Sequence, residues 1–252
     1  SHSSWSSMTM ESDSGESVIV DHDTPHCMTR NVLDNPVWHA LEGPHRVHAL
    51  GRGLARHYPR DMAPFSAIAE PSAAAYADLA ADLPADTEAR LFRPAKEPLP
   101  AGWQEVGNFP MLQMVASRPP EVAEPPMLEL SPADAPAMLE LVAIAQPGPF
   151  GRLTPLLGRY LGIRHGDRLV AMGGERLRLP GHVELSAICV HPAMRGKGYA
   201  AGLTRALTRL ALENDDVPFL HVRPDNVAAV SLYRRLGFEV RRELIVLWRR
   251  PT

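Results

Sequence analysis

A glycine-rich segment with basic side chains is the part of this sequence best suited to chemistry. Residues 189–202 read CVHPAMRGKGYAAG, and Arg195-Gly196-Lys197-Gly198 separates an apolar stretch from a helical pattern. Glycines let a backbone approach a ligand closely, and the following helix offers free amides at its positive end. The segment therefore predicts a cradle for phosphate or pyrophosphate groups. The alternative is a tight strand-to-helix turn with solubilising basic residues.

Two other phosphate-binding signatures do not fit this segment. Lys197 is followed by Gly198 and not by the Ser or Thr that a P-loop requires. The dinucleotide-binding pattern G-x-G-x-x-G matches only if Ala201 replaces its last glycine, and no early strand–helix–strand unit surrounds it. Neither nucleotide-binding class is therefore predicted.

Two motifs resemble those of the GNAT superfamily of N-acetyltransferases. Residues 195–200 (RGKGYA) match the pattern [QR]-x-x-G-x-[GA], and residues 226–238 (NVAAVSLYRRLGF) are similar to the block N-x-x-A-x-x-L-Y-x-x-x-G-F. Both occur in the order of that fold, each at a predicted strand–helix junction. The resemblance covers residues 127–252. It implies an α/β fold of the α+β kind, with a mixed, mostly antiparallel sheet flanked by helices.

The resemblance also implies acetyl-coenzyme A as acetyl donor and a primary amine, in a small molecule or a peptide, as acceptor, with direct transfer in a ternary complex. The pyrophosphate is expected at the amides of residues 195–200. The pantetheine arm is expected to pair with residues 188–190, where that strand splays from the one at 219–222. The cofactor-binding residues implied are Ile188, Cys189, Val190, Arg195, Gly196, Lys197, Gly198, Tyr199, Ala200, Asn226, Ala229 and Tyr233.

Glu184 and Tyr233 are the predicted catalytic residues. Glu184 precedes Arg195 by the offset of the glutamate base in histone-acetylating members of the superfamily, so it is the candidate base, directly or through water. Its alternative is a surface glutamate on a half-exposed strand. Tyr233 is the candidate acid for the thiolate, and its alternative is a packed aromatic residue. The Ile188 amide is expected to stabilise the thioester oxygen. Cys189 is interpreted as a small buried hydrophobe and not as a nucleophile.

The acceptor is expected beside the proline- and glycine-rich segment 146–157, with Phe150 and Glu184 as contacts. The alternative is a plain connection. No metal is predicted, because neither His22, His26 and Cys27 nor His45 and His48 complete a four-ligand pattern.

Apolar periodicity predicts the elements that must position these residues. Strands are expected at 127–130, 160–164, 168–179, 182–190, 219–222 and 243–248, and helices at 131–145, 200–213 and 226–236. Before them, a helix is expected at 73–83 and short strands at 89–92, 104–106 and 111–115. Helices therefore alternate with strands in the manner of an α/β layer structure.

A proline-rich run at 117–126 is interpreted as a linker between two domains. Residues 1–20 are interpreted as a tag remnant and a disordered lead-in. Residues 21–116 are expected to form a smaller α+β domain whose role the sequence does not define. Alternatively, they are a degenerate second copy of the GNAT fold. Residues 127–252 are the predicted acetyltransferase domain.

The composition is that of an ordinary globular protein, with 252 residues, 45% apolar residues and a net charge of -3. No membrane helix and no nucleic-acid partner are expected, because long apolar runs and a global basic field are absent from the sequence. The pairs Arg241-Arg242 and Arg249-Arg250 are interpreted as a solvated edge and tail. The protein is expected to be cytoplasmic, as a monomer or a homodimer. A non-catalytic acyl-coenzyme A-binding sensor or regulatory module is the alternative function.

Overall fold

The structure is a computed structural model, and it describes residues 31–116 and 124–252. Expectations for residues 1–30, including the lead-in and any role of His22, His26 and Cys27, lie outside the described residues, as does most of the predicted linker. No helix in the described part of the chain is both long and apolar enough to cross a lipid bilayer.

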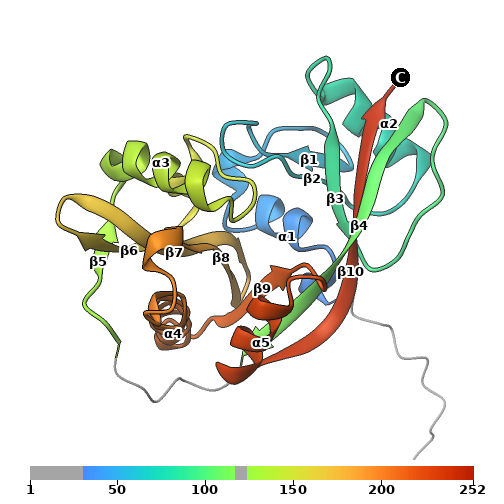
Figure 1. Cartoon of the computed structure of the whole chain (residues 1–252). Helices are drawn as coiled ribbons and strands as arrows, with labels where there is room; N and C mark the ends of the chain where they lie inside the picture. The colour runs from blue at the N-terminus through green and yellow to red at the C-terminus, as the bar shows by residue number, and fades with distance from the viewer. Residues whose placement is uncertain (1–30, 117–123) are drawn as a thin grey trace, which may run out of the picture. The chain divides into compact units, whose positions relative to one another are not determined.

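An eight-stranded sheet forms the centre of the fold (Figure 1). Its order is β3-β10-β4-β9-β8-β7-β6-β5, and every neighbouring pair is antiparallel except β8 and β9, which are parallel. The strands are β3 (Ala89–Arg93), β4 (Trp103–Ala116), β5 (Leu128–Leu130), β6 (Tyr160–His165), β7 (Arg168–Leu179), β8 (His182–Val190), β9 (Val217–Val222) and β10 (Phe238–Pro251). The predicted class, a mixed and mostly antiparallel sheet flanked by helices, is confirmed.

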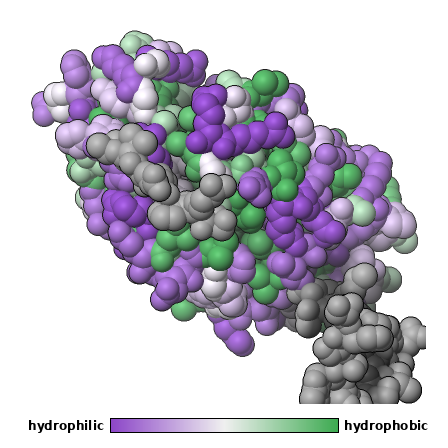
Figure 2. Space-filling view, turned by 90° about the horizontal axis from the view of Figure 1, so that it is seen from below, coloured by the Kyte–Doolittle hydropathy of each residue, from purple (hydrophilic) through white to green (hydrophobic). Residues whose placement is uncertain are grey.

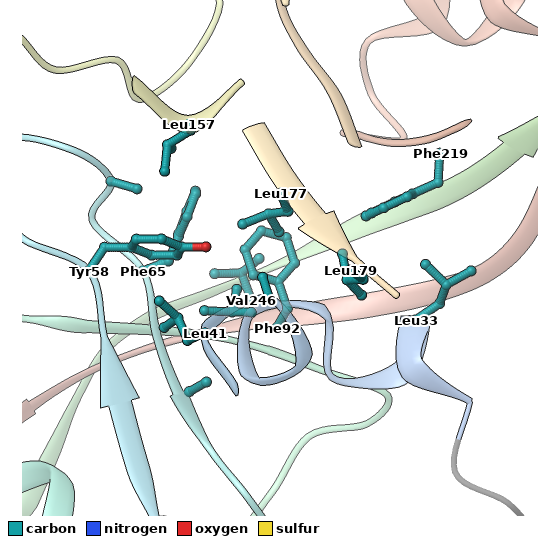
Figure 3. Packing of buried hydrophobic residues seen from close by; sticks show 14 of the residues in the cluster. Leu33, Leu41, Tyr58, Phe65, Phe92, Leu157, Leu177, Leu179, Phe219 and Val246 are labelled. Atoms are coloured by element: carbon teal, nitrogen blue, oxygen red, sulfur yellow. The ribbon is translucent and has the colours of Figure 1, made fainter. Parts of the chain in front are cut away.

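Helices cover both faces of this sheet (Figure 1). On one face, α4 (Tyr199–Glu213) and α5 (Val227–Arg235) pack through residues such as Leu203 and Val230. On the other, α1 (Pro36–Glu42) buries Leu41 in a cluster that also contains Leu177 and Phe219 (Figure 3). The helix α3 (Ala135–Ala145) covers β6 and β7, while α2 (Ala73–Asp82) packs near a separate hairpin-like pair, β1 (Ala55–His57) and β2 (Ser66–Ile68). Strand alternation explains the two cores, because Phe219 and Leu220 point to opposite faces.

The predicted division into an N-terminal domain and an acetyltransferase domain does not match this sheet. Strands β3 and β4 come from the N-terminal part, and β4 lies between β9 and β10 of the C-terminal part. Residues 31–252 accordingly form one compact unit. Apart from the β1–β2 pair, the described N-terminal strands complete the main sheet, so they do not form a separate sheet of their own. A proline-rich run marks a connection, but it does not tell which strands pair across it.

Strand β4 is one strand where the sequence predicted two. It runs unbroken through Pro110, pairing with β10 along its length and with β9 only at Leu112–Val115. At Pro110, β4 therefore pairs with β10 alone, a setting in which a residue without a backbone donor is tolerated. Pro110 thus lies just outside the part of β4 that pairs with β9, and β4 itself continues through it.

The last strand buries an arginine that the sequence assigned to a solvated tail. Arg249 is 0% exposed, because β10 is an inner strand between β3 and β4. Its guanidinium hydrogen-bonds the Tyr76 hydroxyl and donates to the Glu97 carbonyl oxygen at 2.6 Å. The remaining strands and helices predicted within residues 127–252 are present, and β10 extends further in both directions than expected.

Candidate active site

Strands β8 and β9 separate partway along their length, as the sequence predicted. Their last backbone pair is Glu184 with Phe219, and no β9 residue is paired with β8 beyond it in the described chain. On the other side of β8, the register with β7 shifts around Ala187, which has a φ of 54°. Such a bulge turns the strand and increases its local twist. The backbone of residues 185–190 is left with an edge open toward β9.

The glycine-rich loop follows directly on this open edge. Gly196 and Gly198 have φ values of 78° and 76°, a conformation that favours glycine. A Cβ atom at either position would meet nothing within 4 Å, so backbone conformation and not packing demands glycine there. Gly198 begins α4 without a side-chain cap, and Arg195 and Lys197 are exposed beside it. Free amides, a helix dipole and two cations thus converge, as an anionic ligand requires.

Helix α5 contributes the second motif. The Asn226 side-chain oxygen accepts from the Ala229 amide at 3.2 Å and caps the helix, which leaves its amide nitrogen free to donate. One turn further, the Tyr233 ring packs 6.0 Å from Phe238. Desolvation raises the pKa of Tyr233 to about 12. Its hydroxyl has no hydrogen-bond partner among the residues that the structure describes, so it is available to a ligand.

Apolar side chains gather where β8, the glycine-rich loop, α4 and α5 meet. Half-buried members come from β8, α4, α5 and the loop before α4; they are Ile188, Val190, Met194, Tyr199, Ala229 and Tyr233. Figure 2 views the molecule from this side and shows apolar surface among hydrophilic side chains. A partly apolar ligand arm can lie there while its charged end reaches the glycine-rich loop.

The structure places Glu184 in a buried ion pair. Its side chain is 0% exposed, and Arg176 donates to both carboxylate oxygens, at 2.8 Å and 2.6 Å. His221 Nδ1 lies 2.7 Å from one of the same oxygens. Burial alone raises the pKa of Glu184, but Arg176 and His221 outweigh it and lower the pKa to about 2. Glu184 is therefore not a surface glutamate, and no oxygen of it is open to a substrate amine.

The ion pair belongs to a larger network that the sequence analysis missed. The Gln113 side-chain nitrogen donates to the Leu33 carbonyl at 2.8 Å and lies 3.1 Å from His221 Nε2, while Arg241 donates to the Gln113 oxygen at 2.7 Å. Arginine can only donate, so this fixes the Gln113 amide with its nitrogen toward His221. His221 Nε2 then accepts, and Nδ1 carries the proton that it donates to Glu184. These residues lie on separate strands, so no sequence spacing links them.

The segment expected beside the acceptor docks against the N-terminal part of the chain. The Leu153 amide donates to the Asp61 carbonyl at 2.9 Å, and the Thr154 hydroxyl donates to the Met62 carbonyl at 2.6 Å. Phe150 packs edge-on against Tyr160 at 5.8 Å. The N-terminal residues thus hold residues 146–157 in place and do not form an independent module.

Cys189 lies as the sequence analysis interpreted it, and His45 is a second buried group. Cys189 is a free, buried thiol whose pKa burial raises to about 12, so it lies among apolar neighbours without thiolate character. His45 Nδ1 is 2.8 Å from the Tyr58 hydroxyl, and desolvation lowers the pKa of His45 to about 4. Within residues 31–116 and 124–252, no three His, Cys, Asp or Glu side chains gather as metal ligands do.

The chain is similar in sequence to proteins of known families. Residues 160–247 match the model of the FR47-like protein family. A 97-residue stretch is 39% identical to N-alpha-acetyltransferase RimI of Mycobacterium tuberculosis, covering 37% of this chain and 60% of RimI. The chain thus spans less than two thirds of that relative's length.

Solved structures match over more of the chain. A GNAT-family acetyltransferase of Kribbella flavida shares the fold, with a TM-score of 0.58, 21% identity, and coverage of 86% of this chain and 94% of that one. A putative GNAT acetyltransferase of Novosphingobium aromaticivorans is 34% identical with a TM-score of 0.81, covering 88% of this chain and 99% of the other. On this similarity, the chain belongs to the GNAT family of acetyltransferases, for which acetyl-coenzyme A-dependent acetyl transfer is implied.

Proposed function

We propose that this protein transfers the acetyl group of acetyl-coenzyme A to a primary amine, by direct transfer in a ternary complex. The observation that carries the proposal is the open edge of β8, which leads into the glycine-rich loop and lies beside α5. RimI is named an N-alpha-acetyltransferase, so the N-terminal amine of a peptide is the first acceptor class to test.

The residues present fit acetyl-coenzyme A. Gly196 and Gly198 shape a loop whose amides and flanking cations suit a pyrophosphate. The open backbone of residues 188–190 can pair with the amide groups of an extended arm, and the Asn226 side-chain nitrogen can donate to it. When bound, acetyl-coenzyme A supplies a thioester whose carbonyl carbon the amine attacks.

The chain's own groups then perform two tasks. The Ile188 amide, next to the bulge at Ala187, donates to the carbonyl oxygen as it gains negative charge. Tyr233 donates its hydroxyl proton to the departing sulfur, and the resulting phenolate takes up the proton that the attacking nitrogen loses as the amide forms, directly or through solvent. With a pKa of about 12, Tyr233 is protonated at neutral pH before the reaction, and transfer of the nitrogen's proton restores that state.

Glu184 is proposed as a positioning residue and not as the base that the sequence suggested. A carboxylate with a pKa of about 2 and both oxygens occupied is a poor proton acceptor for an ammonium group. Its contacts instead hold Arg176 and His221 at the apex of the splay. The acceptor then reacts from its unprotonated fraction, having lost its proton to solvent.

The buried state of Glu184 also favours a second candidate, a non-catalytic acyl-coenzyme A-binding sensor. Such a protein needs the cradle and the open strand edge but no base. It would bind acetyl-coenzyme A without turnover on any amine, and Tyr233→Phe would then leave every measurable property of the complex unchanged.

The first experiment measures thiol release from acetyl-coenzyme A with a panel of amines, alongside calorimetric binding of coenzyme A. The panel contains peptides with free N-termini, peptides with a blocked N-terminus and a free lysine side chain, polyamines, amino acids and aminoglycosides. Turnover with one class supports the enzyme and identifies the acceptor. Tight binding with no turnover across the panel supports the sensor, and absence of binding contradicts both.

A further inference from the structure

A cavity of about 230 Å³ lies in the N-terminal part of the fold, built by residues other than those of the cofactor cradle. One wall is β1, β2 and the loop between them. The other is the connection from α2 into β3. Its polar lining residues include Arg60, Arg90, His57 and Ser66, while Phe65 and several prolines contribute apolar surface. The cavity therefore offers polar and apolar lining together, so it can hold a small molecule that has both a polar group and an apolar body.

Two arginines line this cavity without a carboxylate partner. Neither Arg60 nor Arg90 has an acidic side chain within ion-pair distance or any side-chain hydrogen bond among residues 31–116 and 124–252. The Arg90 guanidinium lies 4.5 Å from the ring centre of Trp248. Partial burial lowers the pKa of Arg90, Glu88 raises it, and the charge of Arg60 lowers it further. Glu88 thus opposes the charge of Arg60 at Arg90, and an oxyanion bound in the cavity would interact favourably with both guanidinium groups.

The two acidic residues at the cavity act on the arginines without forming an ion pair with them. Glu88 accepts a hydrogen bond from the Trp248 indole nitrogen at 2.6 Å, which engages its carboxylate elsewhere. Asp86 lies exposed at the rim, in a turn where it adopts a φ of 61°. Both acids line the cavity, yet neither lies within 4 Å of a guanidinium nitrogen of the two arginines.

Two further polar side chains of low exposure line the cavity. Ser66 is 3% exposed and His57 is 5% exposed, and both line the cavity. The one side-chain contact found for either in the described chain joins His57 Nδ1 to the Tyr58 carbonyl at 3.1 Å. The Ser66 hydroxyl and His57 Nε2 are not among the buried atoms without a partner in the described chain, so each keeps some exposure and can hydrogen-bond a ligand in the cavity.

We propose that this cavity binds a small organic oxyanion, a carboxylate or phosphate on an apolar body, through Arg60 and Arg90. Arginine presents a planar set of donors that matches two oxygens of such a group. Ser66 and His57 would hydrogen-bond the same group or the adjacent part of the ligand. Phe65, Leu50 and Leu83 would contact the apolar body.

The test uses the full-length protein saturated with coenzyme A, so that the glycine-rich cradle cannot capture the anion. Hexanoate, hexyl phosphate, acetate, inorganic phosphate and hexylamine are titrated while the Trp248 indole N–H resonance is followed by NMR. That resonance is identified with Trp248→Phe, and the indole contacts both Arg90 and Glu88. We expect saturable shifts with hexanoate or hexyl phosphate, weaker binding of acetate and inorganic phosphate, and no saturable shift with hexylamine.

Variants locate the binding. Arg60→Gln and Arg90→Gln should each lower the affinity for the better of the two hexyl ligands about tenfold or more. Arg90→Lys should lower the affinity less, because lysine keeps the positive charge. Arg52→Gln is the matched control, because Arg52 is an arginine of the same region that pairs with Asp82 and does not line the cavity. A preference for hexanoate or hexyl phosphate distinguishes the two anion sources. The proposal is overturned if neither anion binds, or if the two cavity variants bind as well as Arg52→Gln.

Discussion

His221 Nδ1 lies 2.7 Å from a carboxylate oxygen of Glu184, and this hydrogen bond joins β9 to β8 just beyond their last backbone pair. A side-chain hydrogen bond thus links the two strands where their backbone pairing ends. Because Gln113 of β4 holds the other nitrogen of His221, the apex of the splay is tied to a strand from the N-terminal part of the chain. The opening proposed for the cofactor therefore depends on residues far apart in the sequence.

Glu184→Gln should destabilise the protein strongly. It removes the charge that compensates the buried Arg176, and breaking a buried pair in this way costs about 3–5 kcal/mol of unfolding free energy. Chemical denaturation measures this loss. The double variant Arg176→Met/Glu184→Leu should recover much of the stability, because it leaves no uncompensated charge. Wild-type stability in Glu184→Gln would contradict the positioning role.

Tyr233→Phe should lower kcat about 100-fold or more while leaving acetyl-coenzyme A binding unchanged, because it removes only the proton donor. Stability should change little, since the hydroxyl has no partner in the described part of the chain. Steady-state kinetics and calorimetry measure the two effects. Tyr199→Phe is the control on the same face, where only the backbone amide is proposed to act. Equal rates in the two variants would exclude Tyr233 as the acid.

Gly198→Ala should raise the KM for acetyl-coenzyme A about tenfold, because the loop must leave its left-handed conformation and its amides lose their alignment. Gly166→Ala is a matched control. Gly166 has a φ of 60°, a Cβ there would also meet nothing within 4 Å, and it lies in the β6–β7 hairpin loop. The two variants should lose similar stability, about 1 kcal/mol, and only Gly198→Ala should change KM. A rise in KM in both would point to general destabilisation.

The pH dependence of kcat/KM should follow the acceptor amine and not Glu184. A peptide N-terminus has a pKa of about 7.7–8.0, so the rate should rise about tenfold per pH unit below pH 7 and level off above pH 8. Tyr233, with a pKa of about 12, should cause no loss below about pH 11. Rates measured with acceptors of different amine pKa test this. An ascending limb that stays at one pH for all acceptors would instead identify a base on the protein.

Residues 124–252 alone should not fold into a stable sheet. Without β4, strands β9 and β10 lose the neighbour that lies between them, and Gln113 no longer holds His221 and Arg241. Circular dichroism and size-exclusion chromatography of the fragment should show an unfolded or aggregated chain. Adding residues 31–116 as a separate chain should restore the fold. A cooperative thermal transition in the isolated fragment would contradict this dependence.

Local patterns predicted much of the site. The cradle at 195–200 and the helix at 226–236 could be recognised because glycine conformation, helix starts and apolar periodicity act over a few residues. The splay between β8 and β9 was also expected, because the resemblance implied an extended cofactor arm that pairs with β8. The base assignment to Glu184 rested on its offset from Arg195 in the same resemblance, and an offset along the chain cannot report which charge lies opposite a side chain.

The sequence by itself determined the elements of residues 127–252, the glycine-rich loop and the resemblance to an acetyltransferase, because these depend on short-range backbone and side-chain preferences. Only the tertiary structure decided that β4 enters the sheet between β9 and β10. It also decided that Glu184 is sealed by Arg176 and His221, and that Arg249 is buried. Strand order and ion pairing join residues separated by up to two hundred positions. Their energies depend on burial and on partners, which no local pattern specifies.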